Sequence, residues 1–376
     1  MKSHQFTFSP NKGWSHFGDT SFKPDLLLAF GSGKECNGEI LVKWWQENFP
    51  LAKLLGCSTA GEIEGTTVLS GTIVVTAIKF EKTKLELCSL DFDSSEDSED
   101  VGQKLASLLP HEGLKHCFVL SDGLNINGTR LVNGLSKALP EGILITGGLA
   151  GDGKRFELTQ ICTNESYGPN KVAVLGFYGD NIDIRSASFG GWDVFGPERL
   201  ITHAENNVLY ELDGQSALAL YKDYLGEHAK ELPSSGLLFP LKVTTNEGKE
   251  FVRTLLAIEN ETGAMTFAGD IPQGAHAQLM RANFERLIDG ASHAAELALD
   301  KTPPELAILI SCVGRRLVLG QRIEEEVEAV SEIFQNKTQL CGFYSYGEIC
   351  PLLDEVGCTL HNQTMTITTF TEDLQR

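Results

Sequence analysis

The chain of 376 residues carries 31 basic and 51 acidic side chains, which gives it a formal net charge of -20. Such a charge repels phosphate backbones and anionic lipid surfaces, so it argues against nucleic acid and membrane partners. The hydrophobic share of 41% is typical of a globular protein, and the length favours two domains or one domain built from repeats.

Targeting and cysteine patterns both favour the cytoplasm. The first twenty residues contain no apolar segment behind a basic one, which argues against a secretory signal. No apolar run reaches the ~20 residues needed to cross a bilayer. The nine cysteines include no CxxC pair, so reduced thiols are favoured over a disulfide framework or a zinc ribbon. We therefore expect a cytoplasmic protein without a membrane span.

A first structural unit is predicted after a short N-terminal segment. The apolar run 26–30 predicts a buried strand, and the amphipathic pattern at 40–49 predicts a helix. A further strand leads into a glycine-rich elbow at 55–63, Leu-Gly-Cys-Ser-Thr-Ala-Gly-Glu-Ile. β-branched residues predict a strand at 71–80, and alternating polarity predicts another at 85–90. We expect this last strand to complete the unit.

The same order of elements is predicted twice more. In the second unit a strand, a helix and a strand lead to an elbow at 146–152, Thr-Gly-Gly-Leu-Ala-Gly-Asp, and a strand follows at 171–178. In the third unit the elbow at 341–349 reads Cys-Gly-Phe-Tyr-Ser-Tyr-Gly-Glu-Ile, and a strand at 365–370 follows. This repetition predicts a mixed α/β fold, in which repeated β-α-β-β units form sheets covered by helices.

A domain boundary is predicted between the second and third units. The glycine-rich stretch 190–197 and the turn after residue 212 interrupt the regular pattern. We therefore expect an N-terminal extension at 1–24, a first domain at 25–212 and a second domain at 213–376.

The first elbow approaches the Gly-x-Ser-x-Gly pattern of serine hydrolases. Ser58 would be the nucleophile, with Ala60 in place of the second glycine. Such an enzyme also needs a histidine beside the serine, and His203 or His361 would have to reach it through the fold. The alternative is that small residues permit a tight chain reversal. A hydrolase using Ser58 is thus the weaker alternative to a non-enzymatic protein.

Each elbow ends in an acidic residue: Glu62, Asp152 and Glu348. These carboxylates either fix their own loops or line one pocket that accepts hydrogen bonds from a cationic ligand group. Arg315 and Arg316 follow a predicted strand, where a guanidinium can bind a ligand carboxylate or pair internally with an acid of the protein.

The repeated motifs are similar to those of a known family, the FIST sensory domains of bacterial signalling proteins. The resemblance covers residues from about 26 to about 370 and rests on the motifs Gly56–Ile63, Ser121-Asp122-Gly123, Gly147–Asp152, Ser311–Arg316, Gly342–Ile349 and His361-Asn362-Gln363-Thr364. It implies an N-terminal and a C-terminal FIST half.

The resemblance implies a ligand sensor rather than an enzyme. Amino acids are proposed ligands of the family, and some stand-alone members bind haem, sense nitric oxide and act on a partner histidine kinase. This chain resembles such a stand-alone member. Haem would need a ligand such as His361, although a lone histidine is more often structural. The expected ligand-binding residues are Ser58, Thr59, Glu62, Asp152, Arg315, Arg316, Tyr346 and Glu348.

Overall fold

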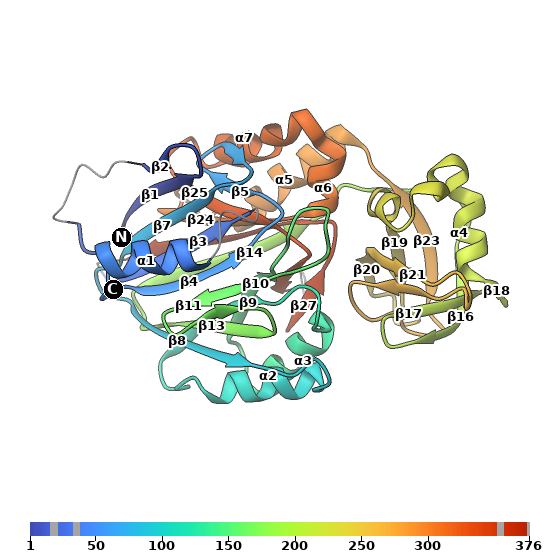
Figure 1. Ribbon diagram of the computed structural model, residues 1–376, viewed down its shortest axis with the longest axis horizontal. Helices are drawn as coiled ribbons and strands as arrows, with labels where there is room; N and C mark the ends of the chain where they lie inside the picture. The colour runs from blue at the N-terminus through green and yellow to red at the C-terminus, as the bar shows by residue number, and fades with distance from the viewer. Residues whose placement is uncertain (16–21, 33–37, 352–356, 374–376) are drawn as a thin grey trace.

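The computed structural model describes residues 1–15, 22–32, 38–351 and 357–373. Figure 1 shows two bodies, a larger one that holds both chain ends and a smaller one built from a stretch in the second half of the chain. Within the described part of the chain, the larger body contains three sheets with related topologies. No helix among the described residues is both long enough and apolar enough to cross a membrane.

The first sheet is built around two parallel strands, β3 (Leu26–Gly31) and β4 (Lys53–Ser58), with α1 (Gly38–Asn48) between them in sequence. β7 (Ile73–Lys79) returns antiparallel beside β3, and β1 (Lys2–Ser9) pairs with the far side of β7. Residues 2–9 were expected to belong to an N-terminal extension. They form a strand of the first sheet instead, paired along β7.

The second and third sheets repeat this arrangement. In the second sheet the parallel strands are β9 (Leu114–Ser121) and β10 (Leu144–Leu149), the returning strand is β13 (Lys171–Tyr178), and the edge strand is β8 (Lys84–Asp91). In the third sheet the corresponding strands are β24 (Leu306–Cys312), β25 (Gln339–Ser345), β28 (Met365–Glu372) and β14 (Ile182–Phe189). The prediction that β8 closes the first unit is wrong, because its eight residues pair with β13 and therefore begin the second unit.

A short strand after each elbow crosses to a neighbouring sheet. β5 (Glu62–Glu64) follows the first elbow and pairs with β25, which leads into the third elbow. β26 (Gly347–Pro351) follows the third elbow and pairs with β10, which leads into the second. β11 (Ile161–Thr163) follows the second elbow and pairs with β4, which leads into the first. This cyclic exchange holds the three elbows together at one place in the molecule.

The sheets share an apolar core on one side and are covered by helices on the other. Phe30 of the first sheet stacks on Phe343 of the third with ring centroids 4.7 Å apart, and Phe118 of the second sheet belongs to the same buried cluster. The covering helices are α1, α2 (Ser98–Ser107), α3 (Gly128–Ala138), α5 (Phe284–Ala298), α6 (Val313–Leu319) and α7 (Ile323–Ile333). Because both faces of β3, β9 and β24 are buried along most of their length, these strands are predominantly apolar.

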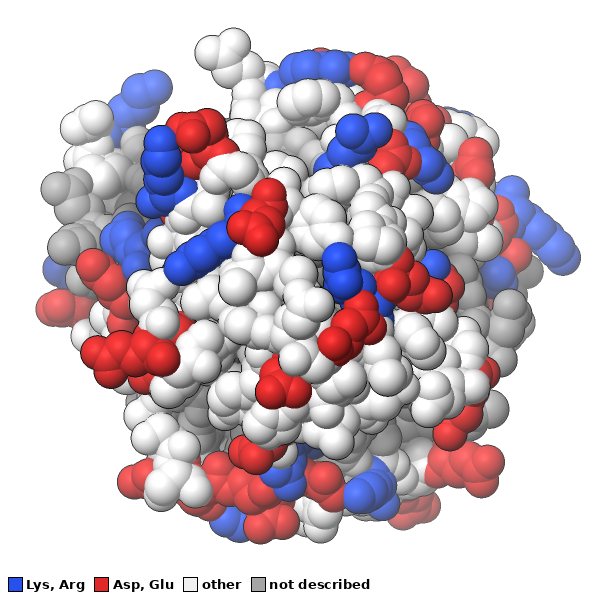
Figure 2. Space-filling view, turned by 90° about the vertical axis from the view of Figure 1, so that its right-hand side faces the viewer, with Lys and Arg blue, Asp and Glu red and all other residues white. Residues whose placement is uncertain are grey.

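The smaller body has its own sheet and core. Its strands are β15 (Asp193–Val194), β16 (Arg199–Glu205), β17 (Val208–Leu212), β18 (Gln215–Ser216), β19 (Leu241–Thr244), β20 (Glu250–Arg253), β21 (Leu255–Ile258), β22 (Met265–Phe267) and β23 (His276–Arg281). Helix α4 (Ala217–Leu225) packs on them around Ile201, Leu241 and Phe267. Figure 2 shows the outer face of this body, where side chains of both charges surround broad uncharged areas.

The boundary expected after residue 212 falls inside the smaller body. β17 pairs with β18 across a hairpin turn in which Asp213 and Gly214 both have positive φ. The turn signal in the sequence therefore marks a hairpin and not a link between the two bodies.

Side-chain hydrogen bonds connect the smaller body to the larger one. Gln363, which lies between β27 (Cys358–His361) and β28, donates from Nε2 to the Thr254 hydroxyl at 3.0 Å. Asn127, at the start of α3, donates to Asp270 at 2.7 Å. The second and third units are thus both tied directly to the smaller body.

Candidate functional site

A cleft of about 350 Å³ opens beside the joined elbows. Its walls come from the first and second elbows, the segment before β7, the loop after the second elbow and helix α6. The lining residues are Ser32, Ala60, Ser70, Gly71, Asp152, Gly153, Lys154, Arg155, Val313, Arg316 and Leu317. The third elbow lies beside this cleft and contacts its walls.

Backbone hydrogen bonds fix the elbows to one another. The Ala60 amide donates to the Tyr344 carbonyl at 2.8 Å, and the Gly151 amide donates to the Ser58 carbonyl at 3.0 Å. The Tyr346 amide completes the cycle by donating to the Leu149 carbonyl at 3.2 Å. Because all three elbows take part, the cleft wall is built from segments nearly 300 residues apart in the sequence.

The first glycine of each elbow is required by close packing of parallel strands. In each sheet this glycine pairs with a residue of the neighbouring strand, and a Cβ atom would collide with the carbonyl oxygen of that residue. The pairs are Ala29 with Gly56, Val119 with Gly147, and Leu309 with Gly342. The repeated glycine in the sequence is therefore explained by the same steric contact in all three sheets.

Glu62 and Glu348 do not line the cleft; both are fully buried behind their elbows. Glu62 accepts hydrogen bonds from the Thr59 hydroxyl at 2.5 Å and the Thr72 hydroxyl at 2.7 Å. Burial raises its pKa, although these hydroxyls, Ser32 and the Arg316 charge act in the opposite direction. These contacts make Glu62 a group that closes its own elbow.

Glu348 repeats this arrangement in the third elbow. It accepts hydrogen bonds from the Ser345 hydroxyl at 2.6 Å and from the hydroxyl and amide of Thr364 at 3.0 and 3.2 Å. Burial raises the pKa of Glu348 to about 8, and the hydrogen bonds offset only part of this effect. The expectation of three acids lining one pocket is met by Asp152 alone.

Asp152 lines the cleft and organises its second wall. Its carboxylate accepts hydrogen bonds from the amides of Phe156, Glu157 and Leu158 at 2.9 to 3.0 Å and from the Tyr346 hydroxyl. Burial disfavours the charged form, but these hydrogen bonds outweigh it and lower the pKa of Asp152. Tyr346 stacks on Phe156 with ring centroids 4.5 Å apart, so it joins the third elbow to the loop after the second.

Arg316 lies on α6 and reaches across the cleft to the first elbow. Its guanidinium donates to the Ala60 carbonyl, to the Leu69 carbonyl at 3.3 Å and to the Ser70 hydroxyl at 2.5 Å. All of these acceptors are uncharged. The guanidinium also lies 5.3 Å from the ring centroid of Tyr344, which orients it further.

Two basic residues of the cleft, Lys154 and Arg155, were not predicted. Both are exposed and belong to the loop that Asp152 closes. Their signal in the sequence is the basic pair directly after the second elbow. The pair matters because it lines the same cleft as Arg316, which is more than 150 residues away along the chain.

Arg315 was predicted to bind ligand, but it is fully buried and does not line the cleft. It forms an ion pair with Glu326 at 2.7 Å and donates to the carbonyls of Gly190 and Leu287 at 2.6 and 2.7 Å. Glu326 also accepts from the Tyr344 hydroxyl at 2.8 Å. These contacts correspond to the internal ion pair considered as the alternative.

Ser58 is engaged as a hydrogen-bond acceptor rather than activated as a nucleophile. Its Oγ accepts from the Gln160 amide at 2.9 Å, and it lines a separate hollow of about 30 Å³. Within the described residues, no histidine forms a hydrogen bond with Ser58. This geometry does not support the hydrolase alternative.

His361 does not fit a haem ligand. It lies in β27, paired with Glu348 of β26, and its Nε2 is 3.1 Å from the Cys350 carbonyl oxygen. Burial lowers the pKa of His361 to about 4, although the Cys350 hydrogen bond opposes this shift. The cleft beside the elbows does not reach it. Its contacts are those of a structural histidine that ties β27 to β26.

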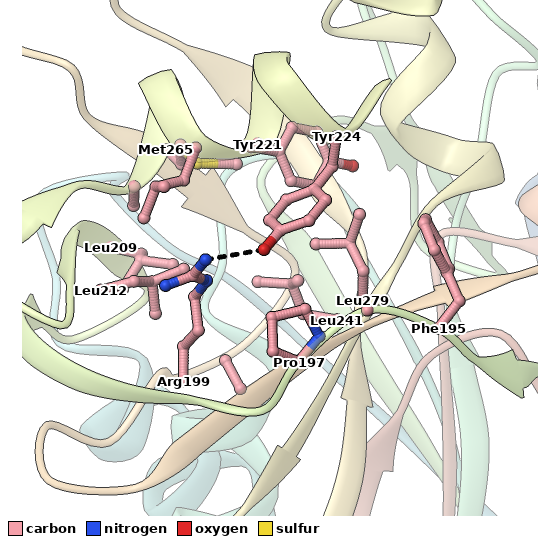
Figure 3. A pocket seen from close by; sticks show the side chains of 14 residues that line it. Phe195, Pro197, Arg199, Leu209, Leu212, Tyr221, Tyr224, Leu241, Met265 and Leu279 are labelled. Carbon is pink, nitrogen blue, oxygen red and sulfur yellow. Dashed lines mark hydrogen bonds between the residues drawn. The ribbon is translucent and has the colours of Figure 1, made fainter. Parts of the chain in front are cut away.

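A second hollow lies in the smaller body, between α4 and the sheet (Figure 3). Its volume of about 10 Å³ is close to the space of a single water molecule. Arg199 lies at its edge and donates to the Tyr224 hydroxyl at 2.7 Å and to Asp213 at 2.9 Å. In this conformation the hollow is too small for a metabolite.

Comparison with known proteins gives matches to two family domains. Residues 25–215 match the FIST N domain, and residues 217–351 match the FIST C domain. An uncharacterized protein of Methanocaldococcus jannaschii is 24% identical over 350 residues. The matched region covers 81% of this chain, and the chain spans 65% of the length of that relative.

Proposed function

Because the chain belongs to the FIST family, whose domains are sensor domains of signal transduction, we propose that it binds a small molecule in the cleft beside the elbows. Binding is then communicated to a partner protein. The observation that carries this proposal is the convergence of two elbows and α6 on one cleft. The ligand-contacting residues of this proposal are Arg316 and the newly found Lys154 and Arg155, while Asp152 shapes the loop that carries the last two.

The other predicted site residues have supporting roles in this proposal. Thr59, Glu62 and Glu348 hold the elbows in shape, and Tyr346 positions Asp152. Ser58 accepts a backbone hydrogen bond and Arg315 forms a buried ion pair, both away from the cleft. A ligand in the cleft would thus touch a wall whose geometry depends on all three units.

The route from the cleft to the partner is proposed to pass through the smaller body. Glu348 accepts from Thr364, and the adjacent Gln363 donates to Thr254 of the smaller body. A shift of the third elbow would therefore be transmitted to the smaller body by two consecutive residues. A histidine kinase is the partner that the family resemblance favours.

Haem with nitric oxide stays a prediction from that resemblance. The absorption spectrum of protein purified from haem-replete cells tests it, because bound haem produces a Soret band. A spectrum without that band, even after haem addition, removes the haem version and leaves the broader sensor proposal in place.

The sensor proposal is tested by thermal denaturation of the full chain with a panel of amino acids, carboxylates and phosphorylated metabolites. A ligand that binds the native state raises the melting temperature. Ser70→Trp places a bulky side chain in an exposed wall of the cleft and is expected to abolish the increase. Ser94→Trp, in an exposed loop that does not line the cleft, is the matched control. An increase that survives Ser70→Trp would show that the ligand binds elsewhere.

A further inference from the structure

The charge of the cleft differs from that of the protein as a whole. The chain carries a net charge of -20, yet the charged residues that line the cleft, within the part of the chain that the structure describes, are three bases, Lys154, Arg155 and Arg316, and one acid, Asp152. Basic groups gathered from two distant segments in an acidic protein create a local positive potential, which attracts anions.

The single acid of the cleft has no capacity left for a cationic ligand group. A carboxylate offers about four acceptor positions. In Asp152, Oδ1 accepts from Phe156 and Tyr346, and Oδ2 accepts from Glu157 and Leu158. In addition, the Nε atom of Arg155 lies 3.6 Å from Oδ2. The carboxylate of Asp152 therefore has no acceptor position left for the ammonium group of a free amino acid.

Arg316 forms no ion pair with the described residues, although its charge acts on the buried Glu62 behind the first elbow. Its guanidinium has five N–H donors, of which three are used by two carbonyls and one hydroxyl. Among the described residues, no carboxylate lies within ion-pair distance of it. A guanidinium held in place by neutral acceptors keeps its charge available, and it forms strong, short hydrogen bonds with carboxylate or phosphate oxygens.

We propose that the ligand of this cleft is a small organic molecule with two negative charges on oxygen, bound by Arg316, Arg155 and Lys154. The apolar surfaces of Val313 and Leu317 accommodate its short carbon skeleton. This inference rests on the proposed sensor function, because it assigns the ligand class of the same cleft. Dicarboxylates and phosphate monoesters share this chemistry.

The test is calorimetric titration of the full chain with succinate, glycerol phosphate, inorganic phosphate and alanine at constant ionic strength. We expect succinate or glycerol phosphate to bind most tightly, and the affinity of that ligand to fall when its titration is repeated at higher ionic strength. Inorganic phosphate has no carbon skeleton, so comparing it with glycerol phosphate measures the contribution of the skeleton to affinity. Alanine is a zwitterion and is expected to bind at least tenfold more weakly than the tighter of the two organic dianions.

A Lys154→Gln/Arg155→Gln double variant removes two positive charges from an exposed loop. We expect it to weaken binding of the dianion by at least about tenfold, the loss for a charge-assisted hydrogen bond. Lys137→Gln, which removes an exposed positive charge from α3, is the control and should leave affinity unchanged. Arg316→Gln is expected to weaken binding further, and the double variant keeps the test valid if Arg316→Gln fails to fold.

Three outcomes would overturn the inference: alanine binding as tightly as the dianions, dianions binding equally to the double variant and the wild type, or no binding of succinate and both phosphates. Alanine binding that Ser70→Trp abolishes would leave the sensor proposal standing. If the metabolite panel also contains no compound that binds in the cleft, the sensor proposal fails as well.

Discussion

The hydroxyl of Thr59 lies 2.5 Å from the carboxylate of Glu62, and both side chains are fully buried behind the cleft. Ser345 and Glu348 form the same pair at 2.6 Å in the third elbow. A repeated hydroxyl–carboxylate contact explains why the first and third elbows share both the hydroxyl residue and the acid three positions later. Glu62 and Glu348 preserve the shape of their elbows, while basic residues beside the elbows line the cleft.

We predict that Glu348→Gln flattens the dependence of stability on pH. Burial raises the pKa of Glu348 from its ordinary value of 4.5 to about 8. Between these values the folded protein holds a proton that the unfolded chain has released, so the free energy of unfolding falls as pH rises from about 4.5 to about 8. This slope is at most about 1.4 kcal/mol per pH unit.

Urea denaturation at several pH values in this range measures the slope. Glu348→Gln should lose this dependence on pH, because Gln does not titrate in this range. Glu328→Gln, an exposed substitution on α7, should keep the wild-type slope. Equal slopes for Glu348→Gln and the wild type would contradict the prediction.

Gly342→Ala is predicted to disturb the third sheet. Its new Cβ atom would collide with the Leu309 carbonyl oxygen of the neighbouring strand. Because Gly342 also has a φ of 157°, the expected loss in free energy of unfolding is more than about 1 kcal/mol. Gly168→Ala has open space around its Cβ position and should change stability little in the same denaturation experiment. Comparable losses in the two variants would argue against the steric explanation.

Arg315→Ala is predicted to lower the free energy of unfolding by about 3–5 kcal/mol, because it leaves the buried Glu326 carboxylate without its ion-pair partner. Arg322→Ala is the matched control, since Arg322 forms ion pairs with Glu285 and Glu325 at the surface. Its expected loss is below about 1 kcal/mol. Guanidinium chloride denaturation distinguishes the two values, and a loss in Arg315→Ala no larger than in the control would refute the prediction.

Gln363→Ala is predicted to loosen the attachment of the smaller body. The side-chain amide of Gln363 donates to the Leu237 carbonyl at 3.1 Å and to the Thr254 hydroxyl at 3.0 Å. Hydrogen exchange should become faster in the segments around both acceptors and stay unchanged in the three sheets of the larger body. Gln335→Ala is the control, because Gln335 also has a positive φ but is exposed on the larger body. Unchanged exchange around Thr254 would contradict the proposed connection.

Much of the fold of the larger body could be predicted because the sequence patterns that indicate it are local. An apolar run such as 26–30 has the composition of a strand buried on both faces, and the elbow repeats stand out from glycine spacing alone. These features predicted the mixed α/β fold and its repeated units, which the structure confirms. The signals do not state which sheet a strand joins, so β8 was assigned to the wrong unit.

The sequence by itself determined the repeat, the elbows and the family resemblance, because short segments carry that information in their composition and spacing. Only the tertiary structure decided which polar groups line the cleft. Glu62 and Asp152 are both acids at elbow ends, yet one is enclosed by hydroxyls and the other lines the cleft. The meeting of Lys154 and Arg155 with Arg316 likewise depends on strand exchange between sheets. Burial and charge at a site are set by residues far apart in the chain, and their contacts exist only after folding.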